Sequence, residues 1–140
     1  MEQIDKCPLF RWLCGMAVRN PVTGEIWRRT DFRVSENDPY TWISGNPTAD
    51  GSEDHEGFMA AAKHGPDLSD PLTVWGIWYL VKENLPEGWQ LRFQGATCAV
   101  IEPICQTDAG IVKWSSLRDE GKRAVDCLWF LSKRKEARND

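Results

Sequence analysis

The chain lacks any long hydrophobic run: none approaches the ~18 apolar residues that a membrane-spanning helix needs. The first six residues, Met1 to Lys6, have neither a basic start nor an apolar run behind them, so they do not resemble a signal peptide. We therefore expect no membrane partner and a cytoplasmic location, in which the five irregularly spaced cysteines stay reduced.

Closely spaced metal ligands are also missing. Structural zinc sites usually contain cysteine pairs two to four residues apart, whereas Cys7 and Cys14 are separated by six residues. The two histidines, His55 and His64, each stand alone. Segment 50–56 has oxygen ligands at alternating positions, but where a calcium loop needs Gly and Glu the chain has His55 and Ala61. We expect no metal ion and no other cofactor.

Recognisable catalytic motifs are absent as well. No serine lies in a strained elbow motif, and no glycine-rich loop joins a strand to a helix as a phosphate cradle would require. Nothing in the sequence places a histidine near Cys98 or Cys105, so a Cys–His nucleophile pair is unsupported. These absences favour a protein that binds its target and is not an enzyme.

What the chain does contain is an excess of tryptophan, with eight Trp against two Tyr. At 140 residues it is long enough to bury a real core, and most of these rings are expected inside it. Eight rings are many for one small core, so one or two are expected at a surface site. The net charge of −4 has the wrong sign for a general nucleic-acid binder, so direct nucleic-acid binding is not expected.

The second half of the chain carries clear start and stop signals. Asp70-Pro71 opens a helix over 71–85 that ends at Pro86, because Asp accepts hydrogen bonds from the first amides and Pro is tolerated at the first helical position. A last helix over 117–132 has Ser116 as its N-cap and Asp119 three residues on, as in a capping box. Between them, alternation and turn residues predict three strands, at 90–94, 97–101 and 111–114.

The first half is predicted to hold a β-hairpin, with strands at 10–19 and 25–34 around a turn with Pro early and Gly late. A short helix over 9–18 remains an alternative. Residues 35–52 form a long polar loop with a short strand at 40–43. Acids near the start of 53–64 and Lys63-His64 near its end predict a helix.

Together these elements predict an α+β fold in a single domain, residues 1–140, with 1–8 and 133–140 as loose ends. An antiparallel sheet, made of the N-terminal hairpin and a three-stranded C-terminal meander, packs against two to three helices. The hairpin either joins this sheet or forms its own. The residues expected to be mostly buried are Trp75, Trp78, Leu91, Phe93, Val100, Val125 and Leu128.

Two runs in the C-terminal half, Val74 to Val81 and Gly88 to Phe93, are followed by a helix with Ala124-Val125, Leu128 and Leu131. This pattern resembles the phage ABA-sandwich domain family, a set of small phage and prophage proteins, over about residues 72–132. The N-terminal 70 residues have no counterpart in it, and the family provides no catalytic signature to map. The resemblance implies an interaction-based protein of a mobile element, present in the cytosol of a bacterial host.

The candidate binding site lies on the hairpin, where guanidinium groups stand beside indoles. Arg offers a planar fork for phosphate or carboxylate, and Trp offers a stacking face. The candidate site residues are Arg11, Arg19, Trp27, Arg28, Arg29 and Arg33, with Trp42 in the long loop. The alternative, that these arginines are only the solvent face of a strand, stays open.

The sequence therefore favours a non-enzymatic inhibitor that contacts a host defence protein or protein complex directly. The acidic segment 50–56 would be a second contact. The alternative is a small protein that sequesters a signalling nucleotide, stacking it on Trp and clamping its phosphates with Arg.

Overall fold

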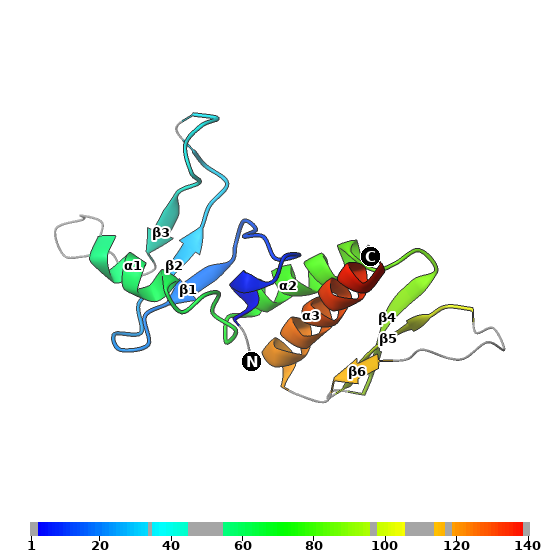
Figure 1. The fold of residues 1–140 in the computed structure, drawn as a ribbon. Coiled ribbons are helices and arrows are strands. Elements are labelled where there is room, and N and C mark those ends of the chain that lie inside the picture. Colours follow the sequence, from blue (N-terminus) through cyan, green and yellow to red (C-terminus); the bar gives the residue numbers. More distant parts are fainter. Residues whose placement is uncertain are drawn as a thin grey trace. The chain divides into compact units, whose positions relative to one another are not determined.

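The computed structural model describes residues 3–33, 35–44, 55–95, 98–105, 114–116 and 119–138. Its mixture of helices and antiparallel sheets confirms the α+β class (Figure 1). The chain divides into two compact units, an N-terminal unit (1–5 and 11–76) and a C-terminal unit (6–10 and 77–140). Each contains one three-stranded sheet, so the hairpin lies in a sheet of its own. Whether the chain behaves as a single domain stays a prediction.

The sheet of the N-terminal unit has the order β1-β2-β3, with β1 at Ala17–Arg19, β2 at Ile26–Arg29 and β3 at Trp42–Ser44. Both strand pairs are antiparallel, which confirms the hairpin and the short strand after it. The hairpin turn is stabilised by Asn20, whose Oδ1 accepts hydrogen bonds from the amides of Val22 and Thr23. Gly24 follows at φ +78°, in the left-handed region that favours glycine.

The first strand is shorter than predicted, and the helical alternative for 9–18 is wrong. Residues 11–13 have no regular structure, and Gly15 has φ +94°, which neither a strand nor a helix adopts. β1 therefore begins only at Ala17. On its outer edge the Ala17 amide donates to Thr73 Oγ1 at 2.9 Å, and its carbonyl accepts from the Asp67 amide at 2.8 Å.

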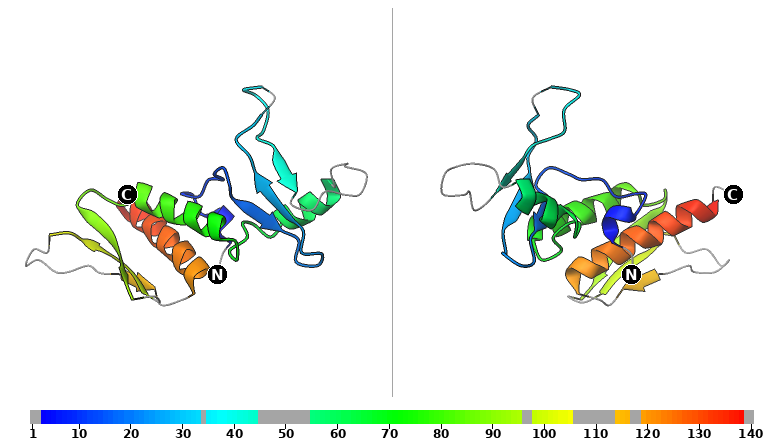
Figure 2. Two further views of the ribbon diagram at one scale, coloured as in Figure 1. Left: turned by 180° about the vertical axis from the view of Figure 1, so that it is seen from behind. Right: turned by 60° about the vertical axis from the view of Figure 1, so that its left-hand side comes forward.

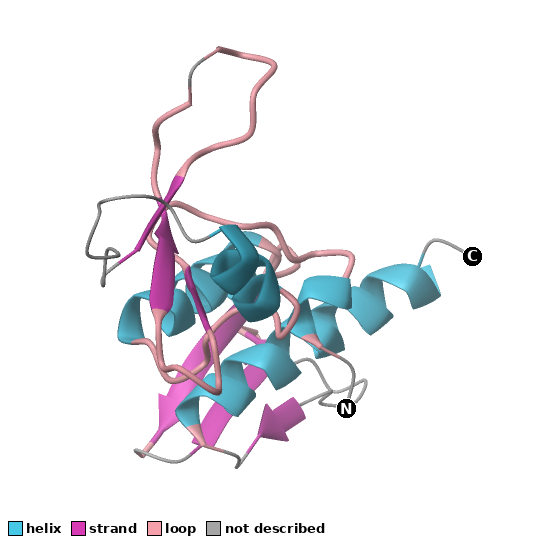
Figure 3. Ribbon diagram, turned by 90° about the vertical axis from the view of Figure 1, so that its left-hand side faces the viewer, coloured by secondary structure: helices cyan, strands magenta, loops and turns pink. Residues whose placement is uncertain are grey.

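Between β2 and β3 the chain forms a projecting loop, here called the arm, of which residues 30–33 and 35–41 are described (Figure 3). The Thr30 amide donates to the Thr41 carbonyl and the Thr41 amide donates to the Phe32 carbonyl, both at 2.8 Å. These bonds hold the base of the arm together.

Helix α1, His55–Ala62, packs against β1 and β2. It covers a small core of Val18, Trp27 and Ala61, around which three aromatic rings gather: Trp12, Trp42 and Phe58. The Trp42 ring centre lies 5.3 Å from that of Trp12 and 5.3 Å from that of Phe58. The helix predicted over 53–64 is confirmed in the part that the structure describes, while residues 53 and 54 lie outside it.

Helix α2, Pro71–Glu83, confirms the helix predicted to open at Asp70-Pro71. Its first six residues belong to the N-terminal unit and the rest to the C-terminal unit. The sheet of the C-terminal unit follows, with β4 at Trp89–Gln94, β5 at Cys98–Pro103 and β6 at Trp114–Ser116, all antiparallel in that order. The predicted meander is therefore confirmed, although residues 111–113 of its last strand lie outside the described residues.

Helix α3, Glu120–Arg138, packs against β5 and β6 (Figure 2). It begins later than predicted because Ser116 belongs to β6, and Asp119 is the N-cap, with its Oδ1 accepting the Lys122 amide at 3.2 Å. The expectation of a loose end after residue 132 is wrong as far as Arg138. There Arg134 stacks on the Trp89 ring, with the guanidinium carbon 4.1 Å from the ring centre.

The N-terminal end is also more ordered than expected. Residues Ile4–Lys6 form a 3-10 helix, and Ile4 and Cys7 are buried. The Cys7 thiol lies 3.9 Å from the Leu128 carbonyl oxygen, which it approaches as a weak donor. The expected loose segment 1–8 is therefore wrong for the residues from Ile4 onward.

Of the expected core, Trp78, Val100, Val125 and Leu128 are buried and Leu91 is half-buried. Two expectations are wrong: Trp75 is 72% exposed and Phe93 is 52% exposed. Trp75 lies on the outer face of α2. Phe93 lies near the end of the edge strand β4, and its ring centre lies 5.0 Å from that of Trp78.

Candidate functional site

The hairpin residues expected to form a surface site have different environments. Trp27 is 4% exposed and belongs to the core between the sheet and α1, so it is no surface anchor. Trp42 is half-buried at the rim of the same aromatic cluster. Arg11 is exposed, and Arg19 pairs with Asp67, its Nε 3.1 Å from the carboxylate oxygen Oδ2.

Arg28 holds the N-terminal unit together. Its Nη1 and Nη2 donate to Asp70 Oδ2 and Oδ1, each at 2.8 Å, and Nη1 also donates to the Gly15 carbonyl at 2.6 Å. A bidentate ion pair of this kind is among the stronger polar contacts in proteins. Arg28 is therefore engaged in contacts within its own unit and is not a free side chain on the solvent face of a strand.

Asp70 connects this pair to the start of α2. Its Oδ2 accepts from the Thr73 amide at 2.9 Å and from the Thr73 hydroxyl at 2.8 Å, so it is the N-cap that the sequence predicted. The hydrogen bond from Arg28, followed by the bonds from Thr73, lowers the pKa of Asp70 to about 2 against the opposing effect of burial. Since Thr73 Oγ1 in turn accepts from the Ala17 amide, the network links β1, β2 and the first turn of α2.

Arg29 and Arg33 meet at the base of the arm, on one tyrosine. The guanidinium carbon of Arg29 lies 4.0 Å from the centre of the Tyr40 ring, and that of Arg33 lies 4.9 Å from it. Arg29 and Tyr40 are half-buried and Arg33 is exposed. Of the seven candidate residues, these two arginines are therefore brought together around one ring.

A second surface feature lies on α2. Leu72, Trp75 and Tyr79 are 57%, 72% and 56% exposed. Their spacing of three and four residues places them on one face of the helix, Leu72 and Trp75 in its N-terminal-unit part and Tyr79 in its C-terminal-unit part. Large apolar side chains gathered in this way are unusual on a protein surface and mark interaction sites.

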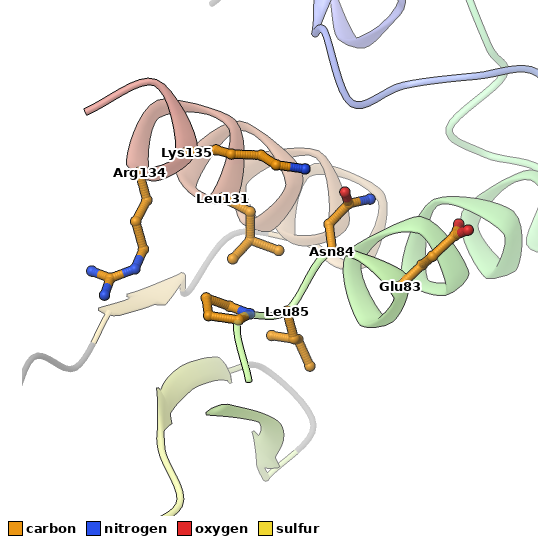
Figure 4. Close-up of a pocket in the computed structure, with 7 residues that line it drawn as sticks. Glu83, Asn84, Leu85, Leu131, Arg134 and Lys135 are labelled. Carbon is orange, nitrogen blue, oxygen red and sulfur yellow. The ribbon is translucent and has the colours of Figure 1, made fainter. Parts of the chain in front are cut away.

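A small hollow lies beside the end of α2 in the C-terminal unit (Figure 4). Its volume is about 220 Å³, below the range of ordinary ligand pockets, which begins near 300 Å³. Leu131 points into it, Glu83 points away, and the Asn84 side-chain amide is used to donate to the Leu80 carbonyl at 2.8 Å. The hollow lies where the chain leaves α2 beside α3, and because it is small we assign no ligand to it.

Among the described residues, no group of three or more His, Cys, Asp or Glu side chains is arranged to hold a metal ion. The five cysteines are free thiols, and burial raises the pKa of the Cys127 thiol to about 12, which keeps it protonated. Among the described residues, no helix is long and apolar enough to cross a membrane.

Residues 50–54 of the predicted acidic segment 50–56 lie outside the described residues.

Sequence reasoning missed Tyr40, Trp75 and Tyr79. Tyr40 could have been suspected, because it begins the short strand predicted at 40–43, the next strand in the chain after the arginine-rich strand of the hairpin. Trp75 and Tyr79 gave no usable signal, since α2 is apolar on nearly every face and the sequence does not say which face is left uncovered. Comparisons with protein-family models, curated proteins and solved structures found no match to this chain.

Proposed function

We propose that the protein acts by binding another protein, without catalysis, through the outer face of α2. In the finer form of this proposal, it inhibits a defence protein of a bacterial host, as the resemblance to small phage proteins implies. The observation that carries the proposal is the 72% exposure of Trp75 between the exposed Leu72 and Tyr79.

The chemistry of this face favours a protein partner. Indole and phenol rings bury large areas and keep a directional donor, so Trp and Tyr dominate the energetics of protein interfaces. A helix that presents anchors three and four residues apart fits an apolar groove on a partner. The first turn of α2 is fixed by Asp70 and Arg28, which reduces the entropy lost when the helix docks.

The test is an affinity capture from a bacterial host lysate, with the wild type and two variants as bait. Trp75→Ala removes the central anchor, and Phe32→Ala is the matched control, because Phe32 is a similarly exposed aromatic residue (64%) on the arm. We expect a partner that the wild type and Phe32→Ala retain and Trp75→Ala loses. Equal capture by all three baits would place the interface elsewhere and refute the proposal for α2.

A further inference from the structure

Tyr40 gathers two positive charges on one ring. Both guanidinium carbons, of Arg29 and Arg33, lie within 5 Å of the ring centre. The negative face of an aromatic ring attracts cations, and gathering two cations near one ring also adds repulsion between the two like charges. An anion bound beside the ring would offset that repulsion.

Neither guanidinium group has such an anion among the described residues. No ion pair joins Arg29 or Arg33 to a carboxylate in that part of the chain, although the arm itself carries Asp31, Glu36 and Asp38. Asp38 accepts instead from the Ser35 hydroxyl at 3.0 Å. The positive charge of the pair is therefore not neutralised by its own arm.

Most of the N–H donors of Arg29 and Arg33 also have no acceptor among the described residues. Arg29 Nη1 donates to the Trp12 carbonyl at 2.6 Å, and Arg33 Nη1 donates to the Glu36 carbonyl at 3.1 Å. These bonds fix the two side chains in place. The Nε and Nη2 groups of both arginines make no hydrogen bond within the described chain, and that edge is the fork with which Arg binds planar or tetrahedral oxyanions.

We propose that Arg29 and Arg33, whose guanidinium groups both lie against the Tyr40 ring, bind the phosphate group of a small phosphorylated molecule. A phosphate monoester carries −1.5 to −2 charges at pH 7, which matches two guanidinium groups, and its three acceptor oxygens suit two forks. A carboxylate carries one charge and two oxygens, and so matches only one of the two arginines. The site consists of residues of β2 and the arm and includes none of the exposed α2 residues, so it does not depend on the proposed protein-binding function.

The test follows the Nε–H resonances of Arg29 and Arg33 by NMR at constant ionic strength. The probes are inorganic phosphate, a nucleoside 5′-monophosphate and the same nucleoside without phosphate. We expect both phosphate probes to shift the two resonances and the plain nucleoside to leave them unchanged. A tighter constant for the nucleotide than for inorganic phosphate would identify the phosphate as part of a larger ligand, and equal constants would identify the free ion.

Variants separate this site from general charge attraction. Arg33→Gln should weaken phosphate binding at least about tenfold, because hydrogen bonds to a charged group contribute that order of affinity. Lys63→Gln, the control, removes an exposed cation outside the arm and should leave the binding constant within about twofold. Arg33→Lys keeps the charge without the fork and should fall between them. Trp75→Ala should change nothing here, whatever it does to protein capture.

Any of three results would overturn the proposal. The first is the absence of any shift at millimolar phosphate, and the second is a shift of the Arg29 resonance in Arg33→Gln equal to that in the wild type. The third is a response to an acidic peptide, added as a further probe, with none to phosphate, which would make the pair a contact for carboxylates of a protein.

Discussion

Replacing Asp70 by Asn should destabilise the N-terminal unit through a single removed charge. The substitution keeps the size of the side chain, and the amide oxygen can still accept from the Thr73 amide. What it removes is the carboxylate partner of Arg28, whose guanidinium is then left with the Gly15 carbonyl. The free energy of unfolding should therefore fall mainly through the lost Arg28–Asp70 pair.

The size of the effect follows from the pKa of Asp70, which the Arg28 and Thr73 contacts lower from its ordinary 3.8 to about 2. At 1.36 kcal/mol per tenfold change in proton affinity, this lowering corresponds to about 2 kcal/mol. The Arg28 side chain is 32% exposed, so solvent screening reduces the expected contribution to about 1–2 kcal/mol.

The assay is urea unfolding of the wild type and Asp70→Asn between pH 7 and pH 2. A carboxyl whose folded-state pKa is depressed contributes stability above its unfolded pKa, near 3.9, and this stability is lost as pH falls toward the folded value near 2. The two proteins should therefore differ by about 1–2 kcal/mol at pH 7 and converge below pH 4.

A matched control is Glu36→Gln, which removes an exposed carboxylate of the same unit and should change the free energy of unfolding by less than about 0.5 kcal/mol. A difference between wild type and Asp70→Asn that stays constant down to pH 2 would refute the electrostatic reasoning. The substitution would then act through capping geometry or packing.

Three further results are expected. Leu128→Ala should cost about 2–5 kcal/mol in urea unfolding, because Leu128 is fully buried in α3; a loss below 1 kcal/mol would contradict this packing. Gly76→Ala should destabilise by about 1–3 kcal/mol in spite of the better helix propensity of Ala, since its Cβ would lie 2.7 Å from Cε of the fully buried Met16; a raised melting temperature would show that Met16 can move. Trp75→Ala should weaken binding to the captured partner at least ~30-fold by titration, the effect of losing a 2 kcal/mol anchor, and leave the melting temperature within a few degrees.

The elements were predictable wherever local signals agreed. Asp70-Pro71 and Pro86 bracket α2, the Asn20 to Gly24 turn sets the hairpin, and the alternation after Gly88 gives β4. These signals involve neighbours in sequence, so they need no knowledge of the fold.

The burial of individual side chains was less predictable, because it depends on partners distant in sequence. Trp75 and Trp78 are three residues apart on the same apolar helix, yet one is exposed and the other buried. Arg28 resembles any outward strand residue until Asp70, 42 positions later, is placed against it. The sequence therefore predicted the arginine-rich hairpin as an element, but not which of its arginines pair with carboxylates, and its role as a binding site stays a prediction.

The pairing at Ala17 also occupies backbone groups at the edge of the sheet. β1 is an edge strand, and an open edge offers unpaired amides and carbonyls to any other extended chain. Both outward backbone groups of Ala17 are already used, one by the Thr73 hydroxyl and the other by the Asp67 amide. The segment leading into α2 thus blocks strand addition at Ala17. Thr73→Val keeps the shape but removes both the acceptor of the Ala17 amide and the donor to Asp70. It should therefore assemble into thioflavin-positive aggregates faster than Leu128→Ala under conditions that leave both variants equally stable.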